Sequence, residues 1–338
     1  MKFYVGIDLH SNNNYIGIID GEKRKVFVKK QSNNLQEILN TLNPFKDLIQ
    51  GIVIESTFNW YWLVDGLQES GYKVHLANTT AIQQYSGLKH VDDKTDALWL
   101  AEMLRLKILP EGYIFSKKER GLRDLLRKRM QLVQHRTALS LSIKGMISNW
   151  SGINISRSEL QKLDSKGIKS FLKNKHGILS AESLLEVTSC LKDQISIIEE
   201  EVIKKVKLKK EFKKLVTVNG IGNILGITIM LETGNISRFE KVGNYTSYCR
   251  CVKAQKKSNG KNKGTNNKKN GNRYLAWAYV EAANYMIRYC PPAKKWYQKK
   301  AAKRGTVLAI KALSSKISRA CYYIMKDNVP FNPAQLFH

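Results

Sequence analysis

The N-terminal third of the chain alternates between short apolar runs and stretches in which apolar side chains recur at helical spacing. Five segments have the length and pattern of β-strands, at residues 3–8, 15–20, 25–30, 51–55 and 72–77. Three segments have the periodicity of helices, at residues 34–42, 60–68 and about 92–107. The order is therefore three strands in a meander, followed by alternating helices and strands.

This order predicts an α/β domain of the ribonuclease H-like (RuvC-like) class, in which an antiparallel meander is joined to parallel crossovers. The pattern changes after residue 115. Long helices are predicted at 119–150 and 182–208, because apolar residues repeat there at helical spacing. Two such helices in succession favour an antiparallel hairpin or coiled coil, which is a common dimerisation device.

The C-terminal region is predicted to be mostly helical, with an interruption at residues 253–273. That segment holds eight Lys or Arg, six Asn and three Gly but no acidic residue. It cannot build a core of its own, so we expect it to be mobile or ordered by a ligand. The sequence thus predicts an α/β domain at 1–115, a helical hairpin or coiled-coil region at 116–210 and a helical domain at 211–338.

The charge of the chain indicates the class of its partner. The 338 residues include 57 Lys and Arg against 28 Asp and Glu, which gives a formal net charge of +29. Because lysine and arginine neutralise phosphates and release counterions, this excess indicates a polyanionic partner. No run of 18 apolar residues is present, which disfavours a membrane protein. The five scattered cysteines fit reduced thiols in the bacterial cytoplasm and no zinc site.

Two acidic residues stand where this fold can hold a metal. Asp8 ends the first predicted strand and Glu55 ends the fourth. Ligands of open α/β sheets gather beyond the carboxyl ends of the parallel strands, so these acids are neighbours if their strands are. Two adjacent carboxylates repel each other unless a cation lies between them. The alternative is that each acid simply leaves its strand into solvent.

Three aspartates, Asp92, Asp93 and Asp96, open the helix predicted from about residue 92. Counting back from Ala97 along the apolar stripe places Asp93 and Asp96 on the sheet-facing side and Asp92 about a hundred degrees away. The alternative is helix capping, with Asp93 as N-cap and Asp96 in the first turn. Together with the strand-end pair, four carboxylates without His or Cys suit hard cations and can hold two Mg²⁺ about 3.5–4 Å apart.

The strings around these acids, GIDLH, VIEST and DDKTDALWLAEML, resemble those of the DEDD transposases of the IS110 insertion-sequence family. That family is related to Piv-type DNA invertases and has a RuvC-like catalytic domain. Residues 216–232 resemble its PGIG segment, with Asn219 where proline is usual, and residues 258–283 resemble its serine-bearing basic loop and alanine-rich helix. The resemblance implies that the four acids hold Mg²⁺ and that Ser258 is the nucleophile, which forms a covalent phosphoserine link to DNA.

Further residues are candidates for contact with nucleic acid. Gly220 and Gly222 would form the turn of a helix-hairpin-helix, whose helix N-terminus offers free N–H groups to a phosphate. A tight helix–helix corner is the alternative. The other candidates are basic residues of the middle helix and of the serine-bearing loop: Arg123, Arg127, Lys128, Arg129, Arg136, Lys256, Lys257, Lys261, Lys269 and Arg273. Four aromatic residues are candidates for stacking on bases or, more commonly, for core packing: Tyr245, Tyr248, Trp277 and Tyr279.

The predicted function is that of an insertion-sequence transposase that cuts and rejoins donor and target DNA as a dimer or tetramer. The resemblance also implies a structured non-coding RNA as guide, which suits a chain without a helix-turn-helix or zinc finger to read bases. Because the acids and Ser258 lie in different predicted domains, we expect them to meet across subunits. The alternatives are a RuvC-like Holliday-junction resolvase or nuclease, a Piv-like invertase that joins other DNA, and a binding protein on a degenerate nuclease fold.

Overall fold

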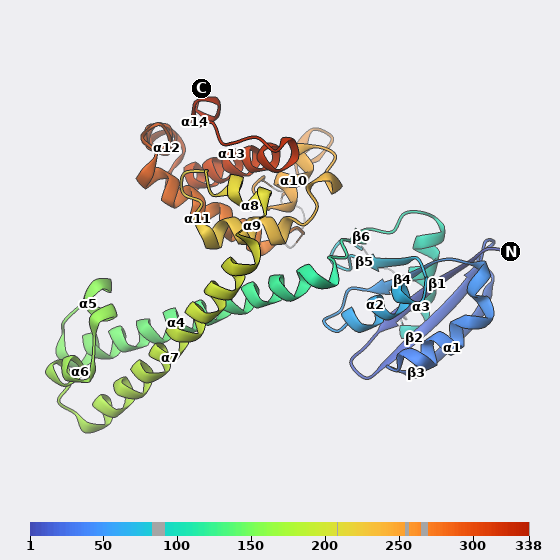
Figure 1. Ribbon diagram of the computed structural model, residues 1–338, viewed down its shortest axis with the longest axis horizontal. Helices are drawn as coiled ribbons and strands as arrows, with labels where there is room; N and C mark the ends of the chain where they lie inside the picture. The colour runs from blue at the N-terminus through green and yellow to red at the C-terminus, as the bar shows by residue number, and fades with distance from the viewer. Residues whose placement is uncertain (83–91, 208, 254–256, 265–269, 338) are drawn as a thin grey trace. The chain divides into compact units, whose positions relative to one another are not determined.

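The computed structural model describes residues 1–82, 92–207, 209–253, 257–264 and 270–337, and the chain divides into two compact units, 1–117 and 118–338 (Figure 1). Each unit has a hydrophobic core of its own, and each is described separately. No helix within these ranges has both the length and the apolar character needed to cross a membrane.

A six-stranded mixed sheet forms the centre of the N-terminal unit. Its strands are β1 (Phe3–Leu9), β2 (Asn13–Asp20), β3 (Lys25–Ser32), β4 (Ile49–Glu55), β5 (Val74–Ala77) and β6 (Glu111–Gly112). They lie in the order β3-β2-β1-β4-β5-β6, with β1, β2 and β3 antiparallel and β1, β4 and β5 parallel. The predicted α/β domain, with its meander and parallel strands, is confirmed. The short strand β6, which pairs antiparallel with β5, has no counterpart in the sequence prediction.

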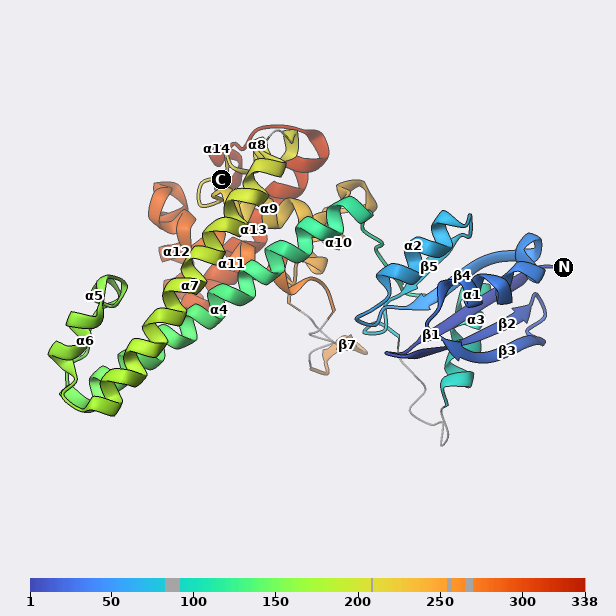
Figure 2. The same ribbon diagram turned by 60° about the horizontal axis from the view of Figure 1, so that its bottom comes forward.

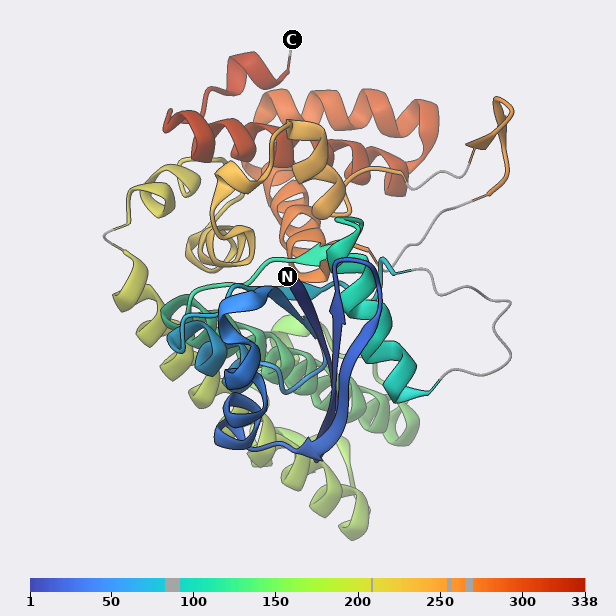
Figure 3. The same cartoon turned by 90° about the vertical axis from the view of Figure 1, so that its right-hand side faces the viewer.

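Helices cover both faces of this sheet. They are α1 (Leu35–Leu42), the 3-10 helix η1 (Asn43–Leu48), α2 (Tyr61–Glu69) and α3 (Asp93–Arg105). Figure 3 shows α1 and α2 on one face and α3 on the other. Side chains alternate along each strand, so Ile7 and Ile54 pack with α1 and α2, whereas Val53 packs with α3. The same alternation turns Asp8 and Glu55 toward the face that α3 covers.

Two glycines allow α3 to lie close against the sheet. A Cβ atom at Gly6 would lie 1.9 Å from the carbonyl oxygen of Ala97, and a Cβ atom at Gly17 would lie 3.1 Å from the backbone nitrogen of Leu98. Both approaches are closer than side-chain carbon atoms normally allow, so only glycine fits at Gly6. The close packing brings the first turn of α3 beside the carboxyl end of β1.

The C-terminal unit is helical apart from a short two-stranded ribbon. Its first elements are α4 (Lys117–Ser151), α5 (Arg157–Lys162), α6 (Ser165–Phe171), α7 (Lys175–Val206), α8 (Lys210–Leu215) and α9 (Asn223–Thr233). The remaining elements are η2 (Ile236–Arg238), α10 (Val242–Tyr248), β7 (Lys257–Ser258), β8 (Lys261–Asn262), α11 (Arg273–Tyr289), α12 (Pro291–Arg304), α13 (Thr306–Asp327) and α14 (Pro333–Leu336). The helical region predicted after the α/β domain is therefore confirmed.

The two long helices α4 and α7 run side by side in opposite directions, and α5 and α6 join them at the far end (Figures 1 and 2). The helix predicted at 182–208 begins earlier, at Lys175, because the side chain of Asn174 accepts hydrogen bonds from the backbone N–H groups of His176 and Gly177. A small core of its own closes the far end of this hairpin, with Ile143, Ile147, Ile155, Ile168, Leu172 and Ala181 buried.

Candidate functional site

Asp8 and Glu55 lie beside each other at the carboxyl ends of two neighbouring parallel strands. Asp8 is the last residue but one of β1, and Glu55 is the last residue of β4. The carboxyl group of Asp8 is buried, 2% exposed, and shares a hydrogen bond with that of Glu55. Two carboxylates this close repel each other unless a cation lies between them.

The pKa values of Asp8 and Asp96 are both raised in this cluster. Burial raises the pKa of Asp8 to about 7, with further contributions from the hydrogen bond to Glu55 and from the charges of Glu55 and Asp93, while His10 opposes the rise. Burial also raises the pKa of Asp96, and the negative charges of Asp8 and Asp93 add to the effect. The structure thus brings all four predicted acids into one electrostatic cluster.

The start of α3 corrects one of the two interpretations of its aspartates. The N-cap is Asp92, whose Oδ1 accepts a hydrogen bond of 2.7 Å from the backbone N–H of Thr95. Asp93 is the first helical residue and so is not the cap, which makes the capping alternative wrong for this residue. The predicted stripe is confirmed, since Ala97 and the apolar residues that follow it on this side of α3 are buried. Asp92 caps the helix, which leaves Asp93 and Asp96 to face the cluster.

A histidine that the sequence analysis left out lies within the cluster. His10 Nε2 lies 3.3 Å from Asp8 Oδ2 and 3.2 Å from Asp93 Oδ2. This nitrogen is shielded from solvent and makes no well-aligned hydrogen bond to any described residue. The three side chains offer ligand atoms that all lie within 4.8 Å of one another, a set that fits a divalent cation. The signal was available in the sequence, because residues two apart at a strand end face the same side.

A pocket of about 400 Å³ opens beside two of the acids. It lies between the end of β4 and the helix α3, within the N-terminal unit. Its lining consists of Glu55, Thr79, Ile82, Asp96, Trp99, Leu100 and Met103. A space of this size is large enough for part of a polymeric substrate beside the carboxylates.

The backbone of Ser258 lies in the two-stranded ribbon of β7 and β8. Ser258 pairs with Lys261, and the two residues between them, Asn259 and Gly260, have φ angles of 48° and 71°. Two successive positive φ angles are typical of a type I′ hairpin turn, and Asn-Gly is its commonest sequence. The segment predicted to be mobile or ordered by a ligand therefore contains a short hairpin, which its Asn-Gly pair could have indicated. Two predicted contacts, Lys256 and Lys269, lie outside the described residues.

The C-terminal end of this segment is tied to the helical core. The backbone N–H of Asn272 donates to the carbonyl oxygen of Tyr248 at 2.6 Å. The guanidinium of Arg250 donates to the carbonyl oxygens of Asn270 and Gly271 at 3.0 and 2.9 Å. Gly271 has a φ of 89°, and a Cβ atom there would lie 2.5 Å from the Tyr248 carbonyl oxygen. The end of the segment is thus held rigidly where α11 begins.

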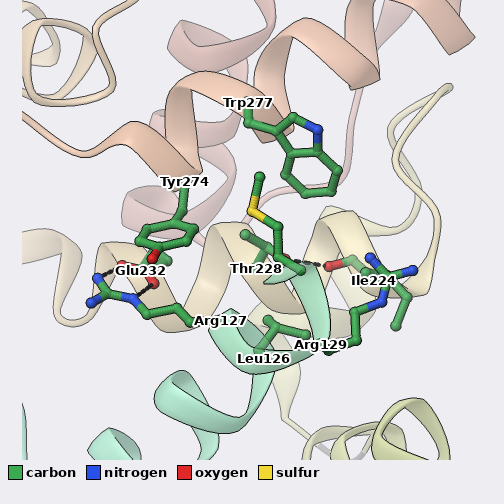
Figure 4. Close-up of a pocket in the computed structure, with 9 residues that line it drawn as sticks. Leu126, Arg127, Arg129, Ile224, Thr228, Glu232, Tyr274 and Trp277 are labelled. Atoms are coloured by element: carbon green, nitrogen blue, oxygen red, sulfur yellow. Dashed lines mark hydrogen bonds and ion pairs between the residues drawn. The ribbon is translucent and has the colours of Figure 1, made fainter. Parts of the chain in front are cut away.

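A buried ion-pair cluster lies directly beneath that end. Arg123 Nε and Arg127 Nε donate to the carboxylate of Glu232 at 2.9 and 2.6 Å, and Asn272 Nδ2 donates to it at 2.7 Å. The ring of Tyr274 covers the guanidinium of Arg127 at 4.3 Å (Figure 4). Burial alone would raise the pKa of Glu232, but the hydrogen bond from Arg127 and the two guanidinium charges hold it below its ordinary value. The adjoining cavity measures only about 10 Å³, so it has no room for a ligand larger than water.

This cluster changes the interpretation of the basic middle helix. Arg123 and Arg127 have an internal carboxylate partner, and Arg129 pairs with Glu199 of α7 at 2.8 Å. These three arginines therefore link helices within the unit. Lys128 is exposed and Arg136 is half-buried, so these two stay as candidates for contact with nucleic acid on α4.

The glycine turn before α9 has two different roles. Gly220 has a φ of 89°, and a Cβ atom there would lie 2.5 Å from the carbonyl oxygen of Ala282 in α11, so it is required for a tight helix–helix corner. Gly222 is the exposed N-cap of α9 and has no atom near its Cα that a side chain would meet. Only Gly222 lies where a phosphate can approach free N–H groups. Arg273 at the start of α11 and Lys261 in β8 are also exposed.

The aromatic candidates belong mainly to the core. Tyr245 and Tyr279 are completely buried, and their hydroxyl groups lie 2.6 Å apart. The ring of Tyr248 lies 4.5 Å from the guanidinium of Arg238, and Trp277 lines the small cavity beside Glu232 (Figure 4). Base stacking is therefore wrong for the two buried tyrosines, as the alternative of core packing predicted.

Two transposase family models match this chain, one in each half of the sequence. Residues 5–150 match the DEDD family model described as "Transposase", and residues 213–298 match the model described as "Transposase IS116/IS110/IS902 family". The chain belongs to the IS110 family of insertion-sequence transposases. It is therefore an enzyme that acts on DNA. The first match covers all four acids, and the second covers Ser258.

Two curated relatives extend the likeness over most of this transposase. A "Probable family 20 transposase" of Pseudomonas aeruginosa is 22% identical over 284 residues, which are 81% of this chain and 82% of the relative. The "Transposase for insertion sequence element IS1111A" of Coxiella burnetii is 23% identical over 287 residues, which are 80% of this chain and 72% of the relative. The likeness thus includes the long helix α7, which lies between the two matched regions.

Proposed function

We propose that this transposase cuts and rejoins DNA with a Mg²⁺ site formed by Asp8, Glu55, Asp93 and Asp96 and with Ser258 as nucleophile. The observation that carries the proposal is the convergence of the four acids in a setting where burial and neighbouring negative charges outweigh His10 and raise the pKa of Asp8 to about 7. Perturbed carboxyl groups beside a pocket are typical of functional sites. The strand order of the sheet supports a ribonuclease H-like assignment of this domain.

The residues present fit a hard divalent cation. Carboxylate oxygens are the ligands that Mg²⁺ prefers, and the unfavourable proximity of Asp8, Glu55 and Asp93 is relieved when a cation lies between them. When bound, Mg²⁺ supplies charge neutralisation and Lewis-acid activation at a phosphate. The acids position that charge at the edge of the sheet, and Gly6 fixes how closely α3 brings its aspartates to Asp8.

The serine chemistry keeps the energy of the broken phosphodiester bond in a new phosphate ester. The Ser258 hydroxyl gives up its proton as its Oγ forms a bond to phosphorus, while the bond from phosphorus to the departing deoxyribose oxygen breaks and that oxygen takes a proton. A phosphoserine ester remains. Attack on it by the hydroxyl of another strand reverses the step, restores the serine and joins the new strand without an external energy source.

We further propose that the acids and the serine come from different subunits of a dimer or tetramer and that a structured RNA guides the choice of donor and target DNA. The assembly is tested by mixing Asp8→Asn protein with Ser258→Ala protein and measuring the covalent protein–DNA adduct in Mg²⁺. Each variant alone should form no adduct. The mixture should regain a substantial part of wild-type adduct formation, because one kind of site then contains both intact halves.

The same experiment separates the proposal from its rivals. Cleavage by Ser258→Ala protein at the wild-type rate would favour a RuvC-like resolvase or nuclease that does not use the serine. Unchanged cleavage by Asp8→Asn protein would refute the metal site. A mixture as inactive as its components would place both halves of the site in one subunit. A Piv-like invertase shares the chemistry and differs only in the DNA that it joins.

A further inference from the structure

A row of lysines along α12 forms a basic surface that is separate from the candidate residues described above. The helix has six Lys or Arg among its 14 residues and no acidic residue. Its inner side packs on the unit through Ala293, which is fully buried, and through Trp296, whose ring contacts that of Phe337. Lys295, Lys299 and Lys303 follow one another at intervals of four residues along the helix, and all three are exposed. We call these three residues the α12 lysine row.

The row is not explained by the stability of the helix. Like charges four residues apart destabilise a helix, and the row contains two such pairs in succession. Of the row, Lys295 opposes the helix dipole near the N-terminus, where no acid lies in the first turn, and only Lys303, in the last turn, complements it. No ion pair joins any lysine of the row to a carboxylate within the described ranges. The charge is therefore directed toward something outside the chain.

The composition of the outer side specifies the kind of partner. Besides the row it presents Lys294, Gln298 and Ala302, all exposed, and no large apolar or aromatic side chain. Helices that lie on membranes present large apolar residues, and surfaces that bind single strands present aromatic rings on which bases stack. A surface with cations alone suits a duplex, whose phosphates are outside and whose bases are already stacked.

We propose that the α12 lysine row binds the phosphate backbone of duplex DNA without regard to sequence. Consecutive lysines of the row are separated by about 6 Å along the helix axis, which is close to the spacing of successive phosphates on a strand. DNA is the polyanion on which a transposase acts. The inference does not depend on the metal site or on Ser258, so it survives if either of those proposals fails.

The test compares full-length wild-type protein with the variant Lys295→Gln, Lys299→Gln, Lys303→Gln. Binding to a labelled random-sequence DNA duplex is measured by fluorescence anisotropy from about 50 to 200 mM salt, where each lost phosphate contact lowers the slope of log affinity against log salt by about 0.9. Loss of three contacts should reduce the slope by about 2.7. The advantage of wild type over the variant should then shrink about 40-fold across that salt range.

A matched control separates position from net charge. Lys162, Lys166 and Lys173 are exposed lysines at the far end of the hairpin, and their replacement by Gln removes the same charge. This control should keep a slope within about one unit of wild type. The charge-conserving variant Lys295→Arg, Lys299→Arg, Lys303→Arg should bind like wild type, and all variants should retain the wild-type helical circular dichroism.

Several results would overturn the proposal. An unchanged slope in the Gln variant would exclude the row, and an equal loss in the hairpin control would show a general effect of net charge. A loss confined to duplex RNA or to single-stranded DNA would identify a different nucleic acid as the occupant. Failure of the Arg variant to bind would show that charge is not what the row contributes.

Discussion

Two buried carboxyl groups, Asp8 in the N-terminal unit and Glu232 in the C-terminal unit, have pKa shifts of opposite sign. Each is 2% exposed, so burial acts to raise the pKa of both. Around Glu232, two guanidinium groups and an amide outweigh burial and hold the pKa below its ordinary value. Around Asp8, two further carboxylates add to burial, and the pKa rises to about 7.

On the proposed function, the difference distinguishes a structural site from a metal-binding one. Glu232 has its counter-charges within the chain, and its cluster links α4, α9 and the start of α11. Asp8 has His10 and other acids as neighbours, and burial and the acids outweigh the histidine, so a cation from outside would relieve the cluster. An uncompensated cluster is unfavourable for folding and persists where it serves to bind a ligand.

The largest expected effect is on stability at the compensated site. Glu232→Gln leaves Arg123 and Arg127 without their counter-charge, which typically costs about 3–5 kcal/mol of unfolding free energy. Denaturant unfolding at neutral pH measures the loss, and amide exchange should be faster in α9 and α11. The matched control is Glu199→Gln, whose half-buried partner is Arg129, and it should lose much less. Equal losses in the two variants would contradict the structural role of the buried cluster.

The opposite sign is expected at the uncompensated site. Asp8→Asn removes a carboxyl group that folding forces into a raised pKa, so in metal-free protein at pH 8 it should stabilise the N-terminal unit, on the order of 2–4 kcal/mol. Protection of β1 amides against exchange reports this change locally. The control Asp20→Asn should destabilise, because that buried carboxylate is paired with Arg24 at 2.7 Å and its pKa is lowered. A destabilised Asp8→Asn protein would show that the cluster is already balanced.

A third prediction tests the geometry of the acid cluster rather than its charge. Gly6→Ala places a methyl group against the Ala97 carbonyl oxygen and forces α3 away from β1, with an expected loss of about 1–3 kcal/mol. It should also weaken Mg²⁺ binding, measured by calorimetry, because Asp93 and Asp96 move away from Asp8. Gly21→Ala is the control, since no atom lies within 4 Å of a Cβ there. Wild-type Mg²⁺ affinity in Gly6→Ala would mean that the α3 acids are not ligands.

Much of this comparison follows from the sequence. Strand alternation and the apolar stripe of α3 place Asp8, Glu55, Asp93 and Asp96 on one side of the sheet, because periods of two and 3.6 residues determine which side chains share a face. The element order likewise predicts the meander and the parallel strands. These features depend on local patterns, which a single sequence contains.

The parts that sequence analysis missed depend on tertiary partners. A basic helix looks the same whether its cations face solvent or a buried acid, and only the fold brings Glu232 to Arg123 and Arg127. The α12 lysine row went unnoticed for the same reason, since its exposure depends on what the other side of the helix contacts. His10 was missed although its spacing from Asp8 already placed it in the cluster.

The smallest expected effect, and the one that compares both sites in a single titration, is on pH dependence. The pKa of Asp8 is raised from 3.8 to about 7, so between these values the folded metal-free protein holds a proton that the unfolded chain has released. Its stability should therefore fall as pH rises toward 7, by at most about 1.4 kcal/mol per unit, and then level off. The pKa of Glu232 is lowered, so its contribution to stability is present above its ordinary pKa of 4.5 and is lost only as pH falls below that value.

Wild type and Asp8→Asn, unfolded in chelator between about pH 5 and 8, should diverge in this window, while Glu232→Gln should run parallel to wild type. Saturating Mg²⁺ should flatten the slope, because each unit below pH 7 weakens its binding about tenfold through competition with the Asp8 proton, and this loss offsets the gain from holding the proton. Parallel curves for wild type and Asp8→Asn would mean that the cluster holds no excess proton, and the contrast with Glu232 would then disappear.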